Sequence, residues 1–111
     1  MAYDESLASR IRDLLADEPG VTEQKMFGGL GFLVHGNMAI GASGQGGALV
    51  RVDPAESDAI LVGSSARPLE MRGRELRGWL RVDGAELRTK RELTKWVELG
   101  TAYARSLPPK R

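Results

Sequence analysis

Arginines gather around a tryptophan in the C-terminal half of the chain, in a pattern able to contact a nucleic acid. Guanidinium groups bind phosphates, and an indole ring stacks on a base. The alternative is structural. In a strand over residues 78–82, Trp79 and Arg81 share one face. In this structural reading Trp79 packs under the final helix and the arginines stay in solvent. The sequence leaves both readings open. The arginines of this possible interaction surface are Arg72, Arg74, Arg77 and Arg81.

The other residues able to do chemistry lack the partners that chemistry requires. His35 is the only histidine, and the chain has no cysteine. A zinc site needs several such ligands, and a general base needs an orienting partner. Ser43 does not lie in a nucleophile-elbow motif. The glycine-rich stretch 41–46 lacks the spacing of a phosphate-binding loop and leads into a strand. We expect no enzyme activity, no catalytic residue, and neither a metal nor an organic cofactor.

Length and composition indicate a single globular domain over residues 1–111. The chain has 111 residues, of which 41% are hydrophobic and 28% are charged, as in ordinary folded domains. No signal peptide is visible at the start, and no apolar run has the length of a membrane span. The absence of cysteine fits a reducing compartment. We expect a cytoplasmic protein without membrane contact.

Charge is unevenly distributed along the chain. The formal net charge is only +1, but residues 67–111 carry twelve bases against six acids, whereas residues 1–24 carry six acids against two bases. A basic segment attracts polyanions. The acids are interleaved with the bases, however, and no helix-turn-helix, zinc-finger or RNA-binding signature accompanies them. We therefore expect nucleic-acid binding to be weak, if it occurs.

Three helices are predicted from apolar spacing and capping residues. Apolar residues at helical intervals indicate a helix over 4–17 and another over 89–107. The second of these begins with the capping box Thr89–Glu92. A short helix over 53–62 is predicted to start at Asp53, because Asp caps a helix and the following proline suits the first helical position.

Short apolar runs separated by glycines predict an antiparallel sheet. A type II′ turn at Gly36-Asn37 is expected to join two of the strands. Strands joined by tight turns pair antiparallel, and the helices cover one face. The fold class is therefore α+β, with two layers: an antiparallel sheet of about five strands and helices packed on it. Three or four strands are expected in the first run, from the segments 22–27, 30–35, 38–42 and 48–52, and two in the second, at 69–71 and 78–82.

One combination of motifs resembles a known family. The run 25–29, Lys-Met-Phe-Gly-Gly, is followed by Gly-Asn-Met at 36–38 and later by Gly78-Trp79. Together these resemble the N-terminal domain of the TfoX/Sxy family over essentially the whole chain, as in a stand-alone TfoX N-terminal domain protein. We interpret the signature as structural, with Phe27 as a core anchor beside glycines that allow close packing. Its residues are Lys25, Met26, Phe27, Gly28, Gly29, Gly36, Asn37, Met38, Gly78 and Trp79.

The resemblance implies an α-β3-α-β2-α arrangement like that of secretion chaperones, and a regulatory role in bacteria. Full-length TfoX/Sxy proteins act in natural competence as coactivators of the cyclic-AMP receptor protein, and they carry a second, helical domain. For a chain ending at Arg111 the implied role is a non-enzymatic interaction module, accessory to transcription regulation. We expect protein partners and a homodimer. The alternatives are a small-molecule-binding domain, an unrecognised enzyme and a weak nucleic-acid binder.

The lack of metal ligands generates a first prediction. We expect EDTA to leave the thermal melting temperature unchanged, because metal-dependent small domains lose folding free energy when the metal is removed. Differential scanning fluorimetry with and without EDTA measures this, alongside elemental analysis. A fall of several degrees, or stoichiometric zinc, would contradict the prediction.

Overall fold

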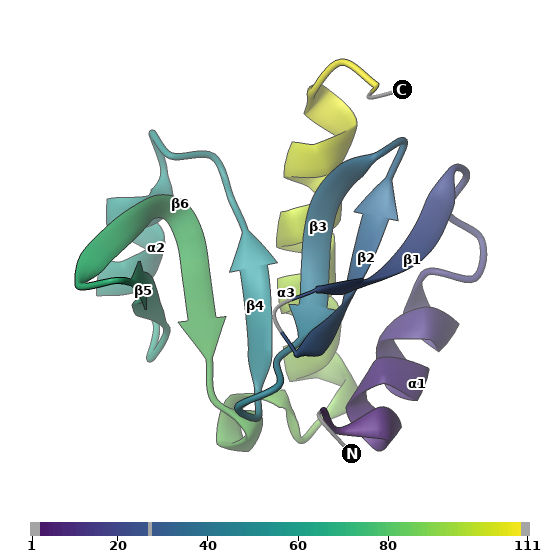
Figure 1. The fold of residues 1–111 in the computed structure, drawn as a ribbon, viewed down its shortest axis with the longest axis horizontal. Helices are drawn as coiled ribbons and strands as arrows, with labels where there is room; N and C mark the ends of the chain where they lie inside the picture. Colours follow the sequence, from purple (N-terminus) through teal and green to yellow (C-terminus); the bar gives the residue numbers. More distant parts are fainter. Residues whose placement is uncertain (1–2, 27, 110–111) are drawn as a thin grey trace.

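Six strands form one antiparallel sheet in the order β1-β2-β3-β4-β6-β5 (Figure 1). The computed structural model describes residues 3–26 and 28–109, and the strand count refers to these. All neighbouring strands pair antiparallel, so the predicted α+β fold is confirmed. The strands are β1 (Val21–Met26), β2 (Gly29–Val34), β3 (Asn37–Ala42), β4 (Ala48–Arg51), β5 (Arg67–Met71) and β6 (Arg74–Val82).

The helices pack on the sheet as a second layer. The element order is α-β4-α-β2-α, with one strand more than the α-β3-α-β2-α arrangement, because β1 and β4 both pair into the sheet. None of the described helices combines the length and the apolar character that crossing a membrane requires. The helices are α1 (Glu5–Leu14), α2 (Ser57–Val62) and α3 (Lys90–Ser106), with a short 3-10 helix, η1 (Gly84–Leu87).

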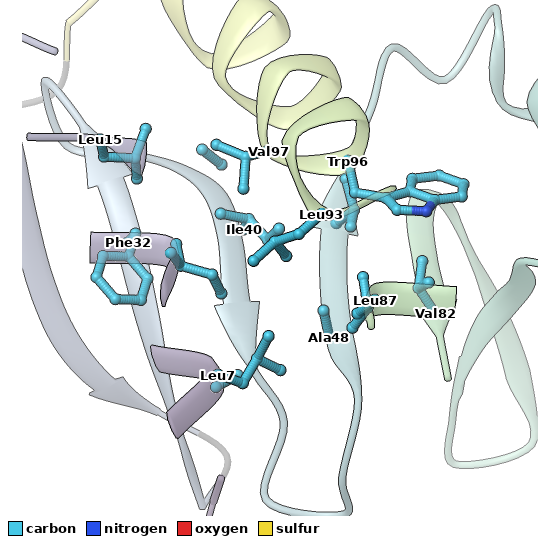
Figure 2. Packing of buried hydrophobic residues seen from close by; sticks show 14 of the residues in the cluster. Leu7, Leu15, Phe32, Ile40, Ala48, Val82, Leu87, Leu93, Trp96 and Val97 are labelled. Carbon is cyan, nitrogen blue, oxygen red and sulfur yellow. The ribbon is translucent and has the colours of Figure 1, made fainter. Parts of the chain in front are cut away.

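The core lies between the sheet and the helices α1 and α3. Phe32 and Ile40 face each other across β2 and β3 and are fully buried. Leu93 and Trp96 of α3 pack into the same cluster (Figure 2). Each of these large side chains stabilises the fold by roughly 1.5–3 kcal/mol through the apolar surface that it removes from water.

A β-bulge brings α3 unusually close to the sheet. The pairing of Phe32 with Ile40 is followed by that of Leu33 with Met38, which leaves Ala39 as the extra residue of β3. Gly100 of α3 lies directly against this bulge: a Cβ there would collide with the Ala39 carbonyl oxygen. Gly100 therefore allows the close approach of α3, and its partner is the bulged backbone of β3.

Two of the hairpin turns, β2–β3 and β5–β6, differ from the sequence-based expectation. Between β2 and β3 the central turn residues are His35 and Gly36, with φ angles of 50° and 84°. Two positive φ values define a type I′ turn, so the prediction of a type II′ turn at Gly36-Asn37 was wrong. Between β5 and β6, Arg72 and Gly73 also have positive φ values, of 53° and 78°. This tight turn replaces the longer link expected between two short strands.

Strand β6 is longer than predicted and is bent at a glycine. The expected strand 78–82 is only its second half. Gly78 has a φ of 86°, and a Cβ there would lie 2.9 Å from Pro54 Cγ and 3.0 Å from the Val52 carbonyl oxygen. The register with β5 shifts beside this point. The glycine thus lets one strand pair with both β4 and β5 while it bends.

The structure confirms the capping box and shows that the second helix begins later than predicted. The Glu92 amide donates to Thr89 Oγ1 at 3.0 Å, and the Thr89 amide donates to Glu92 Oε1 at 3.3 Å. Asp53, predicted to begin the second helix, instead accepts a hydrogen bond from the Ala55 amide at 2.9 Å within a turn. Helix α2 starts only at Ser57, because the Asp side chain closes a local turn first.

The bulge contact generates a stability prediction. We expect Gly100→Ala to lower the free energy of unfolding by about 1–3 kcal/mol, because the new methyl group meets a backbone carbonyl that cannot rotate away. This loss outweighs the gain of roughly 1 kcal/mol from better helix propensity. Urea unfolding monitored by tryptophan fluorescence measures it.

The matched control is Gly84→Ala, where a Cβ would meet no atom within 4 Å. This change should shift stability by no more than about 0.5 kcal/mol. Equal stability of wild type and the Gly100→Ala variant would show that α3 can move away from β3.

Candidate interaction surface

One face of the sheet is not covered by α1 or α3, and we call it the open face. In Figure 1 the strands are seen from this side, with α3 behind them. The side chains that alternate with the core residues of each strand point toward it. It has an apolar part on β1 to β4 and a basic part on β6. Its residues are Thr22, Gln24, Met26, Gly31, Leu33, Met38, Gly41, Leu49 and Arg81.

Two methionines of the open face lie on a floor of glycines. A Cβ on Gly31 would lie 2.9 Å from Met38 Sδ and 3.0 Å from Met26 Cε. A Cβ on Gly41 would lie 2.9 Å from Met38 Cε. Larger residues at these glycines would therefore displace the methionines. Met38 is buried against this floor at 7% exposure, and Met26 is half-buried at the edge. Thioether side chains are flexible and polarisable, so the exposed part of Met26 can adapt to the surface of a partner.

Most of the remaining signature residues that the structure describes set the path of the backbone. A Cβ on Gly29 would collide with the Ala42 carbonyl oxygen. The Asn37 side chain donates from Nδ2 to the Pro108 carbonyl at 2.9 Å, which ties the β2–β3 hairpin to the residues after α3. Gly28 has a φ of 76°, and Lys25 is exposed. Phe27, predicted as a core anchor, lies outside the described residues.

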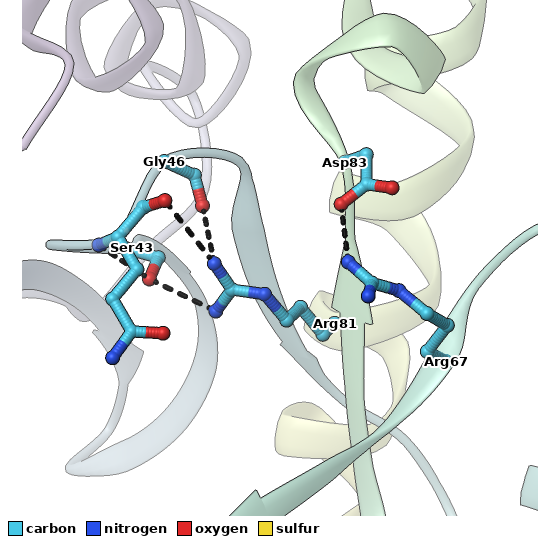
Figure 3. A network of polar contacts seen from close by, with 6 residues as sticks. Ser43, Gly46, Arg67, Arg81 and Asp83 are labelled. Atoms are coloured by element: carbon cyan, nitrogen blue, oxygen red, sulfur yellow. Dashed lines mark hydrogen bonds and ion pairs between the residues drawn. The ribbon is translucent and has the colours of Figure 1, made fainter.

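Arg81 is occupied by the loop between β3 and β4. Its guanidinium donates to Ser43 Oγ at 3.3 Å and to the carbonyls of Gln45 and Gly46 at 3.3 and 3.1 Å (Figure 3). Three hydrogen bonds from one charged group hold the loop against β6. Arg81 therefore has a structural role, which could not be recognised from the sequence because the loop is distant along the chain.

The other arginines of the predicted surface occupy different places. Arg77 donates from Nε to the Pro54 carbonyl at 3.3 Å. Arg72 and Arg74 are exposed at the tip of the β5–β6 hairpin. Beside Arg81, Arg67 forms an ion pair with Asp83 (Figure 3). Only the two arginines at the hairpin tip thus extend into solvent without a hydrogen bond to the described chain.

Trp79 is half-buried and lies outside the buried core cluster. Arg51, opposite it at the end of β4, places its guanidinium carbon 5.6 Å from the Trp79 ring and 5.5 Å from that of Tyr103 in α3. Such cation–π contacts are worth about 0.5–1 kcal/mol each at accessible sites. Sequence reasoning missed Arg51, because its two rings come from separate elements. The tryptophan that fills the core beneath α3 is instead Trp96, which belongs to the helix itself.

The ion pair between α1 and β1 sets the charge at one edge of the sheet. Arg12 donates from Nη2 to Glu23 Oε1 at 2.9 Å. This hydrogen bond is the main cause that lowers the pKa of Glu23 below its ordinary value. Glu23 therefore stays ionised at neutral pH. Among the described residues, no group of three or more His, Cys, Asp and Glu side chains is placed to hold a metal ion.

The fold and this surface define an α+β domain whose distinctive residues shape a sheet. A family model for the TfoX N-terminal domain matches residues 13–104. The chain therefore belongs to the TfoX N-terminal domain family. Comparison with curated proteins found no significant match, and comparison with solved structures likewise found none.

The dispersal of the arginines generates a prediction about nucleic acids. We expect duplex DNA to bind with a dissociation constant of about 10⁻⁴–10⁻⁶ M at physiological salt and without sequence preference, as phosphate contacts alone allow. Replacing Arg72, Arg74 and Arg77 with Ala should abolish this binding for all sequences equally. Titration of labelled duplexes at two salt concentrations measures it. Nanomolar, sequence-dependent binding would make this a DNA-recognition domain instead.

Proposed function

We propose that this protein is a cytoplasmic, non-enzymatic protein-interaction module that binds its partner through the open face and acts as an accessory to transcription regulation. The observation that carries the proposal is the division of the sheet. One side holds the core beneath α1 and α3, and the other carries Met26 and Met38 on a glycine floor. Membership of the TfoX N-terminal domain family supports the regulatory part.

The chemistry of the open face favours a protein partner. Leu33 and Leu49 are half-buried there, beside the two thioethers, and the basic residue Arg81 borders them. Interfaces combine an apolar centre with a polar rim, and methionine and arginine are enriched in them. A partner segment with apolar side chains and an acidic flank would complement this arrangement.

The residues brought together give no support to a catalytic reading. Ser43 accepts a hydrogen bond from Arg81 and also from the Gln45 amide at 3.1 Å, so it contacts a cation and a turn rather than a general base. His35 is exposed in a hairpin turn. A nucleophile needs a base within hydrogen-bond reach, and a base needs an orienting group.

The proposal is tested by placing a charge on the open face. In Leu49→Glu, a carboxylate replaces a half-buried side chain opposite Arg81, so the new charge has a nearby cation while the apolar centre is lost. Val62→Glu is the matched control, because Val62 is 89% exposed on α2 and lies away from this face. Tagged proteins are expressed at native level, and captured partners are quantified by mass spectrometry.

We expect a defined partner to be captured by wild type and by Val62→Glu and to be reduced at least about tenfold with Leu49→Glu, since truncation or disruption of a central interface residue typically costs more than 1 kcal/mol. Circular dichroism confirms that both variants fold. Equal capture by both variants would place the partner elsewhere on the surface, and recovery of no partner by any of them would contradict the proposal.

A further inference from the structure

The two edges of the sheet differ in how they are protected. At one edge, β5 contains Pro68, which lacks an amide donor, and its register with β6 shifts beside that residue. Proline and irregular pairing are common means of blocking strand addition. At the other edge, β1 pairs with β2 through six consecutive residues without a shift, and it contains no proline. Figure 1 shows these strands at opposite sides of the sheet.

The outward peptide groups of β1 follow from one hydrogen bond. The His35 amide donates to the Gly20 carbonyl at 2.9 Å, directly beyond the Val21–Val34 pair. Hydrogen-bonded and non-hydrogen-bonded pairs alternate along an antiparallel ladder. The peptide groups of Thr22 and Gln24 therefore point toward β2. Those of the intervening residues point away from the sheet; they are Val21, Glu23 and Lys25.

We infer that β1 is a self-association edge, at which a second copy of this chain adds its own β1 antiparallel about a two-fold axis at Gln24. This register sets Glu23 of one copy opposite Lys25 of the other, twice. It also brings outward peptide groups against outward peptide groups, so each of these pairs exchanges two backbone hydrogen bonds. Two six-stranded sheets thereby join edge to edge through an isologous interface.

Charge selects this register among those that the backbone allows. An axis at Glu23 would place two carboxylates opposite each other, and an axis at Lys25 would place two ammonium groups opposite each other. An axis at Thr22 pairs Val21 with Glu23 and leaves Lys25 without a partner. Opposite charges across a strand pair stabilise it, and like charges destabilise it, by roughly 0.2–1 kcal/mol per pair. Only the axis at Gln24 forms the two opposite-charge pairs.

The two charged side chains of this register lie at the surface, Glu23 already paired with Arg12 and Lys25 not. The four residues from Thr22 to Lys25 are exposed. Arg12 binds both oxygens of the Glu23 carboxylate from the helix side of the sheet. The carboxylate stays charged, and each oxygen has a second lone pair that can accept a hydrogen bond from the Lys25 ammonium of the other copy. Lys25 forms no ion pair with the described residues. A partner's carboxylate therefore meets an ammonium group that the single copy leaves in solvent.

Cysteine crosslinking of the full chain tests the register directly, because the natural sequence contains no cysteine. Across the axis, the two copies of residue 24 form a non-hydrogen-bonded pair with Cα atoms about 4.5 Å apart, within the range for a disulfide. Gln24→Cys should therefore give a disulfide-linked dimer under mild oxidation. Thr22→Cys is the matched control, because it is exposed on the same face of the same strand.

In the proposed register the two copies of residue 22 are offset by four residues, roughly 13 Å along the strand, so Thr22→Cys should crosslink at least about tenfold more slowly. Light scattering should give a dimer mass for wild type at high micromolar concentration. Lys25→Glu should weaken this dimer about tenfold, because two attractive pairs become repulsive. An equimolar mixture of Lys25→Glu and Glu23→Lys should restore it.

Three outcomes would overturn the inference. The first is a monomer mass for wild type at every concentration tested. The second is crosslinking of Thr22→Cys as fast as that of Gln24→Cys, which would indicate another register or random collision. The third is an unchanged dimer in Lys25→Glu, which would place the interface away from β1. Circular dichroism of each variant separates these results from loss of the fold.

Discussion

The contact between α3 and the bulge in β3 is the constraint on which the rest of the structure depends. Ala39 is an extra residue in its strand, and its carbonyl meets α3 where Gly100 has no side chain. Helix and sheet thereby approach more closely than two ordinary surfaces. Leu93 and Trp96 then reach the core beside the fully buried Phe32. If the helix moved outward, these large side chains would leave voids that close packing does not tolerate.

The same constraint gives the sheet two different faces, one packed beneath α1 and α3 and one left uncovered by them. Because α1 and α3 cover one face of the sheet, the other face is left uncovered, with two methionines lying on a floor of glycines. The end of α3 is also fixed, since Asn37 holds the Pro108 carbonyl and Arg105 binds Glu18. The open face and the β1 edge are thus the parts of the sheet that α1, α3 and the neighbouring strands do not cover.

The contacts of the charged residues depend on the tertiary structure and cannot be read from composition. The excess of bases after residue 67 suggests a polyanion site. In the structure, Arg81 holds a loop, Arg77 binds a carbonyl and Arg67 pairs with Asp83. Arg51, which lies outside that basic segment, contacts two aromatic rings. Cations near one another in sequence are therefore distributed among separate structural tasks rather than gathered at one shared site.

The sequence by itself determined the class of fold, the antiparallel pairing and the capping box at Thr89, because these rest on local periodicity and capping rules. The resemblance carried by its glycine and methionine motifs also predicted the family. Only the tertiary structure decided the turn type at His35, the bend of β6 at Gly78 and the start of α2, since each depends on how distant backbone segments meet. The partners of Arg51 and Arg81 likewise come from residues far along the chain. The orientation of the β1 peptide groups required the observed register, because shifting a strand by one residue reverses which groups face outward.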